Sequence, residues 1–254
     1  MLHIRRFGEG SPLLALHGFT LTGAQFEPCA AALNREIIAP DLPGHGNSGS
    51  SSSDIGHTVT AIAEILDTFD EPVPILGYSQ GARLALLVAA TTDASIDALV
   101  LVSGTAGIQD SADRSRRAAA DATTAEAIRS QGIEGFLERW TTTGLTSTDH
   151  LRDDQRATDM AVRSTNTADG LAAALVGYGQ GQQPSVWDQL GGIETPTLLV
   201  TGSTDSKYTS LNDRMAQLLP HARHDVIAGA GHNPLAETPK PSYTAIRSFL
   251  DGLG

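Results

Sequence analysis

The heptapeptide GYSQGAR at 77–83 places one serine, Ser79, midway between two glycines. The apolar run VPILGY (73–78) precedes it and the apolar run LALLVAA (84–90) follows, so a buried strand would enter the serine and a helix would leave it. A serine on such a tight turn projects its hydroxyl beyond the sheet, where it can attack a substrate or relay a proton. We therefore predict that Ser79 is catalytic rather than an ordinary turn residue.

A serine hydroxyl needs a base, and the base needs an acid that orients it. Asp205 follows the apolar run TLLVTG (197–202), and His232 follows the run HDVIAG (224–229). Sites in open α/β sheets lie at the carboxyl ends of the strands, so these two side chains are predicted to converge on Ser79. The order serine, aspartate, histidine along the chain is that of the α/β-hydrolase fold.

Two backbone N–H groups are predicted to stabilise negative charge beside Ser79. Gln80 begins the helix after the serine, and Phe19 lies in LHGFT (16–20), which follows another apolar run. The other histidines and Asp41 are interpreted as structural: His17 and His45 in structural hydrogen bonds, Asp41 as a turn former, and His3, His57, His150, His221 and His224 as solvated or locally bonded.

The remaining sequence indicates the elements that position these groups. Buried strands are predicted at 13–18, 36–40, 73–78, 98–104, 197–202 and 224–229, and amphipathic helices at 57–69, 80–91, 209–219 and 240–251. Apolar runs that alternate with helices predict an α/β fold, a mainly parallel sheet with helices on both faces. The serine-rich stretch 46–54 is predicted to be a flexible loop.

Between the two groups of strands lies a long segment of different character. Residues 105–190 contain no convincing strand run and show helical spacing at 111–130 and 149–163. We interpret 105–190 as a helical lid inserted into one α/β core, whose two parts are 1–104 and 191–254.

Composition excludes several classes of partner. The net charge of −12 argues against a nucleic acid or an acidic membrane surface, because both call for a basic face. No apolar stretch is long enough to span a bilayer, and no residues have metal-ligand spacing, so we expect neither a membrane span, a metal nor a cofactor. The single cysteine, Cys29, excludes an internal disulfide, is interpreted as a packed residue and fits a cytoplasmic protein. The oligomeric state stays open, a monomer included.

Nearly the whole chain resembles the α/β-hydrolase superfamily. Within it, the segments GYSQGARLAL, DLPGHGNS, DDQRATDMAVRSTN, TGSTDSKY and AGAGHNPLAE together resemble the 2-succinyl-6-hydroxy-2,4-cyclohexadiene-1-carboxylate synthases of menaquinone biosynthesis. The resemblance implies a lyase whose small-molecule substrate is a cyclohexene with several carboxylates and an enolpyruvyl ether. Such an enzyme abstracts a ring proton and eliminates pyruvate.

The resemblance also implies roles for particular residues. Ser79, Asp205 and His232 would act together as a base, with the serine relaying the proton and no acyl-enzyme formed. A polyanionic ligand that enters a negatively charged protein needs a locally positive pocket, and each arginine–carboxylate contact contributes roughly 1.5–3 kcal/mol. The residues expected to contact the substrate are Arg83, Arg163, Arg117, Trp140 and Tyr78.

Two other functions stay open from the sequence. A serine hydrolase of a small acidic substrate (a carboxylesterase, lactonase or carbon–carbon bond hydrolase) would use the same three residues with Ser79 as nucleophile. The arginines argue against it, because a neutral ester pocket has no reason to bury them. A non-catalytic binding module on the same fold would be expected to lose one of the three residues, and all are present.

Overall fold

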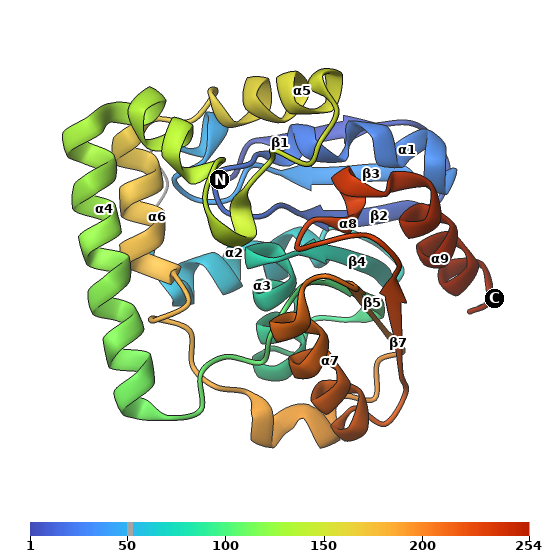
Figure 1. Ribbon diagram of the computed structural model, residues 1–254. Coiled ribbons are helices and arrows are strands. Elements are labelled where there is room, and N and C mark those ends of the chain that lie inside the picture. The colour runs from blue at the N-terminus through green and yellow to red at the C-terminus, as the bar shows by residue number, and fades with distance from the viewer. Residues whose placement is uncertain (50–52, 254) are drawn as a thin grey trace.

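One sheet organises the chain, which the computed structural model describes over residues 1–49 and 53–253. Its strands follow the order β1-β3-β2-β4-β5-β6-β7 (Figure 1). Only β1 runs antiparallel to its neighbour, and every other pair in the sheet is parallel. The strands are β1 (Ile4–Phe7), β2 (Pro12–Leu16), β3 (Glu36–Pro40), β4 (Val73–Tyr78), β5 (Ile96–Val102), β6 (Thr197–Gly202) and β7 (Ala222–Ile227).

The strands bury alternate residues on opposite faces of the sheet. In β2, Leu14 and Leu16 join one hydrophobic cluster, whereas Leu13 and Ala15 join the other. The first cluster includes residues of α2 (Ile55–Leu66), α3 (Gln80–Thr91) and α7 (Ser206–Leu218). The second includes residues of α1 (Glu27–Leu33) and α9 (Pro239–Asp251). Helices therefore cover both faces, which confirms the predicted α/β architecture.

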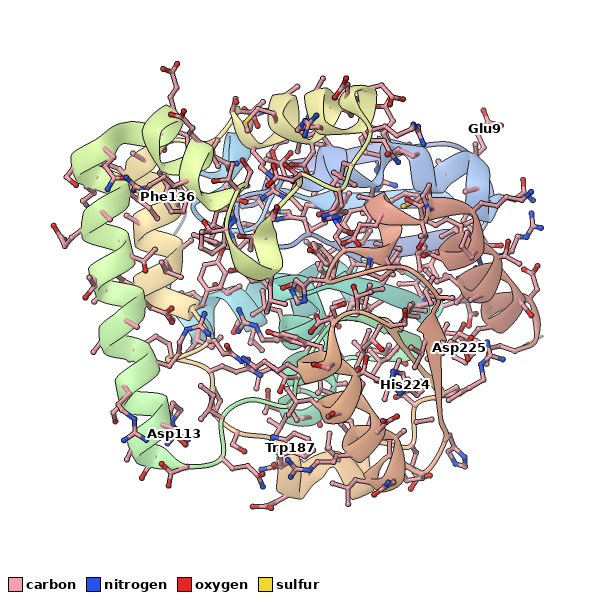
Figure 2. All side chains as sticks on the ribbon, in the orientation of Figure 1. Glu9, Asp113, Phe136, Trp187, His224 and Asp225 are labelled. Atoms are coloured by element: carbon pink, nitrogen blue, oxygen red, sulfur yellow. The ribbon has the colours of Figure 1, made fainter. Side chains whose placement is uncertain are left out.

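The segment between β5 and β6 is helical wherever it is regular. It holds α4 (Ser111–Trp140), α5 (Asp153–Arg163), α6 (Ala168–Tyr178) and the short turns η3 (Gly144–Thr146) and η4 (Trp187–Gly192). Helix α4 is interrupted at Gly132, whose φ of 71° breaks the helical backbone. Figure 1 shows α4 and α6 side by side, and Phe136 (Figure 2) packs with residues of both helices in a third hydrophobic cluster.

Several predicted boundaries were wrong, and some elements were missed. The last strand begins and ends two residues earlier than predicted, at 222–227 instead of 224–229. Strand β1 was missed because IRRF carries two arginines at a sheet edge, where one face stays exposed. Helices α1 and α6 were also missed, and α4 extends ten residues beyond 130.

The serine-rich loop is described only in part, because residues 50–52 lie outside the described residues. Its first part contains the turn η2 (Gly46–Ser48), and Asp54 at its end caps α2 by accepting from the His57 backbone N–H. Among the helices formed by residues 1–49 and 53–253, none combines the length and the apolar character needed to cross a bilayer.

Candidate active site

Ser79 occupies a strained turn between β4 and α3. Its φ is 49° and its ψ is −103°, a conformation that costs a non-glycine residue about 1–3 kcal/mol. A hydrogen bond to the neighbouring strand β5 holds the turn, since the Ser79 N–H donates to the Val102 carbonyl at 2.8 Å. Gly81 permits the close approach of α3 to the sheet, because a Cβ there would lie 1.9 Å from the Leu16 carbonyl oxygen. The strand-turn-helix predicted from GYSQGAR is therefore present.

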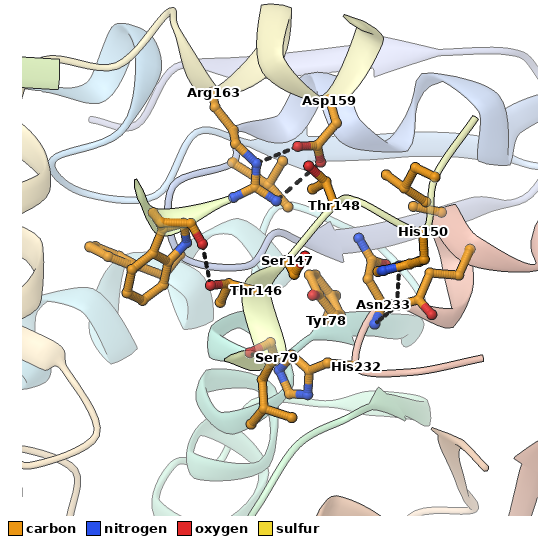
Figure 3. A pocket seen from close by; sticks show the side chains of 17 residues that line it. Tyr78, Ser79, Thr146, Ser147, Thr148, His150, Asp159, Arg163, His232 and Asn233 are labelled. Carbon is orange, nitrogen blue, oxygen red and sulfur yellow. Dashed lines mark hydrogen bonds and ion pairs between the residues drawn. The ribbon is translucent and has the colours of Figure 1, made fainter. Parts of the chain in front are cut away.

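The structure brings Asp205 and His232 to this serine. Ser79 Oγ lies 3.1 Å from His232 Nε2, and the His232 Nδ1–H donates to Asp205 Oδ2 at 2.7 Å. Asp205 follows β6 and caps α7 by accepting the Tyr208 N–H, which fixes its carboxylate. His232 follows β7, and Figure 3 shows its ring beside Ser79. Asp205 and His232 are buried and Ser79 is partly buried, and the distances between them fit a proton relay from hydroxyl to imidazole.

The loop after β2 brings the Phe19 N–H to the same end of the sheet. The next residue, Thr20, has a φ of 68° and is fully buried. Two side chains of the segment after β5 hold it: the Arg163 guanidinium donates to Thr20 Oγ1, and Asn166 Nδ2 donates to the Thr20 carbonyl at 2.7 Å. Arg163 and Asn166, at the end of the segment DDQRATDMAVRSTN, therefore anchor this loop. Gln80 is the first residue of α3, where a backbone N–H has no acceptor within the helix.

His17 fixes the other side of this loop, as the sequence predicted. Its Nδ1–H donates to the Gly18 carbonyl, and its Nε2 accepts the Leu42 N–H, each at 2.9 Å. The ring is completely buried, and that burial lowers the pKa of His17 to about 4. Neutral His17 therefore ties the end of β2 to the chain that leaves β3.

We expect this histidine to make folding sensitive to mild acid. In the unfolded chain the imidazole takes up a proton with its ordinary pKa of about 6.5, whereas in the folded protein His17 is protonated only near pH 4. Its stabilising contribution is therefore complete above pH ~6.5 and is lost as the pH falls toward 4, by about 3 kcal/mol. Urea unfolding at several pH values should show this loss reduced in His17→Gln. His221→Gln, an exposed control, should follow the wild type. If the free energy of unfolding falls equally with pH in the wild type and in His17→Gln, His17 is not the source of the acid sensitivity.

Asp41, predicted to form a turn, joins three segments. It is fully buried and accepts two hydrogen bonds from the Arg5 guanidinium, one from the Gly23 N–H and one from the Asn47 N–H. Burial alone would raise the pKa of Asp41, but these hydrogen bonds and the Arg5 charge outweigh it and hold the pKa below its usual value. Asp41 is therefore a structural carboxylate, ionised at neutral pH.

A pocket opens in front of Ser79. Three of the predicted substrate residues, Tyr78, Trp140 and Arg163, belong to its wall (Figure 3). Burial raises the pKa of Tyr78, so its phenol is neutral at physiological pH. The other lining residues are Phe19, Leu21, Leu145, Thr146, Ser147, Thr148, His150, Leu151, Asp159, His232, Asn233, Ala236 and Glu237.

Trp140 both packs against the core and faces the pocket. Its ring lies edge-on to Phe19 at 5.5 Å between centroids and also contacts Phe136. Its indole Nε1–H is buried without a hydrogen-bond acceptor among the described residues. A buried donor of this kind at a pocket wall is available to a ligand oxygen.

Arg163, which was predicted to contact the substrate, is already bound by other protein groups. Its guanidinium makes two hydrogen bonds to the Asp159 carboxylate, one turn earlier in α5, in addition to the bond to Thr20. Both side chains of the ion pair are more than nine-tenths buried. The charge of Arg163 is therefore largely balanced by Asp159 before any ligand arrives.

Arg83 lies on α3, outside the pocket that Arg163 lines. It is 8% exposed and does not belong to the described lining of the pocket in front of Ser79. Within the described residues its guanidinium donates to one side chain, Gln183 Oε1 at 2.9 Å, and has no carboxylate partner. Burial lowers its pKa to about 10, so it stays charged at neutral pH. Gln183 Nε2 and Gln80 Nε2 are also buried, and neither has a hydrogen-bond acceptor among the residues that the structure describes. This region therefore offers donors and positive charge with few acceptors.

Arg117 is bound to neighbouring protein groups. Its Nε donates to Asp121 Oδ1 at 2.7 Å and its Nη1 donates to Gln180, three residues before the Gln183 that Arg83 contacts. Its side chain is 40% exposed. Like Arg83, it lies outside the described lining of the pocket in front of Ser79.

Sequence reasoning missed three ionisable residues of the pocket: Asp159, which pairs with Arg163, and also His150 and Glu237. His150 was interpreted as solvated or locally bonded, and Glu237 was part of AGAGHNPLAE without an assigned role. His150 Nε2 lies 3.3 Å from Glu237 Oε1, and both line the pocket. Nothing local in the sequence joins Glu237 to His150.

Comparison with known proteins places this architecture in a family. The model of the Alpha/beta hydrolase family matches residues 13–243, and the chain belongs to that family. A Bacillus subtilis (strain 168) protein is 31% identical over 95% of this chain and 90% of its own length. The 2-succinyl-6-hydroxy-2,4-cyclohexadiene-1-carboxylate synthase of Salmonella heidelberg (strain SL476) is 30% identical over 98% of this chain and 99% of its own. MenH from S. aureus superposes with a TM-score of 0.94 at 28% identity, covering 100% of this chain and 99% of the other.

Proposed function

We propose that the chain is a lyase that eliminates pyruvate from 2-succinyl-5-enolpyruvyl-6-hydroxy-3-cyclohexene-1-carboxylate, a step of menaquinone biosynthesis. The product is 2-succinyl-6-hydroxy-2,4-cyclohexadiene-1-carboxylate, the compound in the name of its Salmonella relative. The structural observation that carries the proposal is Arg83, a buried cation without a carboxylate partner in the described chain, one turn after Ser79. A buried charge of this kind is costly unless an anion compensates it.

The reaction balances without a second reactant. A base removes the proton at ring carbon 2, which is acidified by the adjacent succinyl ketone. The electron pair forms the 2,3 double bond, the 3,4 double bond moves to 4,5, and the bond from carbon 5 to the enolpyruvyl oxygen breaks. The departing enolpyruvate takes up a proton and becomes pyruvate. The enzyme therefore needs a base and a means of stabilising an enolate-like oxygen.

We assign the base to Ser79, His232 and Asp205 acting together. Ser79 Oγ accepts the ring proton as its own proton passes to His232 Nε2, and the Asp205 carboxylate stabilises the imidazolium that forms. The N–H groups of Phe19 and Gln80 are proposed to donate to the ketone oxygen as it gains charge. No acyl-enzyme is required at any point.

The arginines are proposed to bind the substrate carboxylates from two directions. Arg163, with Trp140 and Tyr78, stands in the pocket in front of Ser79, and Arg83 lies in the donor-rich region on α3. Arg117 is assigned to the same side as Arg83, because Gln180 and Gln183 link the two arginines to one loop. Asp159 balances Arg163, and Asp121 pairs with Arg117. Among the described residues, Arg83 therefore supplies the uncompensated positive charge that offsets the repulsion between a protein of net charge −12 and a polyanion.

We further propose that residues 105–190 act as the lid of this site. Trp140, His150 and Arg163 of the segment line the pocket, and Asn166 ties it to the loop of Phe19. A cytoplasmic location, which the single cysteine and the small-molecule substrate favour, is also proposed.

Arg83→Ala should weaken substrate use without weakening the fold. Loss of one charge-assisted contact of roughly 1.5–3 kcal/mol predicts a KM raised about 10- to 100-fold. Stability should change little, since removing an uncompensated buried cation also removes its desolvation cost. Steady-state pyruvate release and thermal unfolding measure the two effects, with the exposed Arg214→Ala as control. Unchanged kinetics with a lowered Tm would contradict the carboxylate assignment.

A further inference from the structure

The backbone on both sides of His232 is held by one carboxylate. Glu237 accepts the Gly231 N–H and, through its other oxygen, the Asn233 N–H at 2.8 Å. These two amides flank His232 directly. The side chain of Glu237 is only 7% exposed, so these charge-assisted bonds lie in a protected environment.

These two hydrogen bonds from the backbone around His232 to Glu237, here called the clamp, require the carboxylate to lie close to the loop. Glu237 ends the four-residue helix α8 (Pro234–Glu237), which turns the chain back toward the loop. A Cβ on Gly231 would stand 3.0 Å from Glu237 Oε2, so glycine leaves room for the carboxylate. Asp205 orients the imidazole through its Nδ1, and Glu237 fixes the backbone from which that imidazole projects.

The lid segment rests on the same short helix. His150 Nε2 lies 3.3 Å from Glu237 Oε1, and Gln155 Nε2 donates to the Ala236 carbonyl at 2.9 Å. Both contacts come from 105–190, and they meet two consecutive residues of α8. Figure 3 shows His150 and Asn233 on the same side of the pocket as His232. Displacement of the lid segment would therefore remove the protein groups that cover the clamp.

We propose that Glu237 is a positioning residue that couples docking of the lid segment to the alignment of His232. With His150 and Gln155 docked on α8, the Glu237 carboxylate holds the loop and His232 Nε2 faces Ser79 Oγ. Without that docking the loop relaxes and the base is misaligned. The inference rests on the proposed role of His232 as the base, and it makes lid closure a condition for proton transfer.

Glu237→Gln tests the clamp, because glutamine keeps the size of the side chain but loses the charge and one acceptor oxygen. A small misplacement of a catalytic group costs up to about 100-fold in rate, so kcat for pyruvate release should fall about 10- to 100-fold with KM nearly unchanged. The downfield proton resonance of the His232 Nδ1–H should shift or broaden. Labelling of Ser79 by a fluorophosphonate should slow in parallel. Glu194→Gln, which removes an exposed glutamate paired with His221, is the matched control and should leave all three unchanged.

His150→Gln tests the coupling. Alone it should lower kcat and the labelling rate a few-fold. Added to Glu237→Gln it should have no further effect, because it acts through that carboxylate. If the two substitutions instead lower kcat by factors that multiply in the double variant, the proposed coupling is wrong. A Glu237→Gln protein with a lowered Tm but wild-type kcat, resonance and labelling rate would reduce Glu237 to a purely structural role. Labelling and resonance do not depend on the natural substrate. If they respond as expected while the wild type releases no pyruvate, the proposed reaction fails and the positioning role of Glu237 stands.

Discussion

Replacing His232 or Ser79 with alanine is expected to lower kcat for pyruvate elimination by about 1,000-fold, while the fold stays intact. The physical reason is that a positioned base contributes roughly 100- to 10,000-fold to a proton transfer. Ser79 Oγ and His232 Nε2 are 3.1 Å apart, so either substitution breaks one relay. The two effects should not multiply in the double variant, because both residues serve a single step.

Steady-state kinetics of the two single variants and the double variant measure this effect, with thermal unfolding to check the fold. His221→Ala is a suitable control, because this histidine is exposed and pairs only with Glu194 among the described carboxylates. Mass spectrometry of the wild type during turnover adds a second criterion. An adduct on Ser79 would contradict a lyase in which serine only relays a proton. Turnover that survives either alanine substitution would contradict the relay itself.

Gly81→Ala is expected to destabilise the protein strongly. Its Cβ would lie 1.9 Å from the carbonyl oxygen and 2.3 Å from the carbonyl carbon of Leu16, in a central strand of the sheet. Helix α3 would have to move away from β2 and take Ser79 with it. We expect a loss of more than about 4 kcal/mol in the free energy of unfolding, or failure to obtain soluble protein.

The matched control is Gly135→Ala, at a partly buried position of α4. There a Cβ would meet Gln131 at 3.6 Å, an ordinary contact, and alanine favours the helix. This variant should be neutral or slightly stabilising in urea unfolding, whereas Gly81→Ala should be strongly destabilised. Equal stability of the two variants would show that α3 and β2 have more freedom than their packing indicates.

Much of the fold was predictable because buried parallel strands have a simple signature. The runs around 13–18, 73–78, 98–104 and 197–202 are continuous and apolar, and each corresponds to a strand within a few residues. Strand β1 lacked that signature, since an edge strand with one exposed face can carry arginines. Helix α6 was hidden in an apolar, glycine-containing stretch without a clear polar face.

The candidate site also contains a part that could be predicted from the sequence and a part that could not. Ser79, Asp205 and His232 were predictable because each follows a recognisable strand, and a parallel sheet brings such positions to one edge. The Arg163–Asp159 ion pair is a local contact of residues four apart in α5, a spacing that the sequence displays, whereas the Arg83–Gln183 contact and the His150–Glu237 pair were not predictable. The latter two depend on how the lid segment packs on the core, over separations of up to 100 residues, and no local pattern encodes that packing.

The most direct test of the account compares two reactions of the wild-type protein. Pyruvate release is followed from the enolpyruvyl substrate, generated in place by the enzyme that makes it, and hydrolysis is followed from a short-chain aryl ester. We predict rapid pyruvate release and feeble ester cleavage, because the buried Arg83 has no carboxylate partner among the described residues and a substrate carboxylate would compensate its charge. Rapid ester hydrolysis without pyruvate release would contradict it and identify Ser79 as the nucleophile of a serine hydrolase.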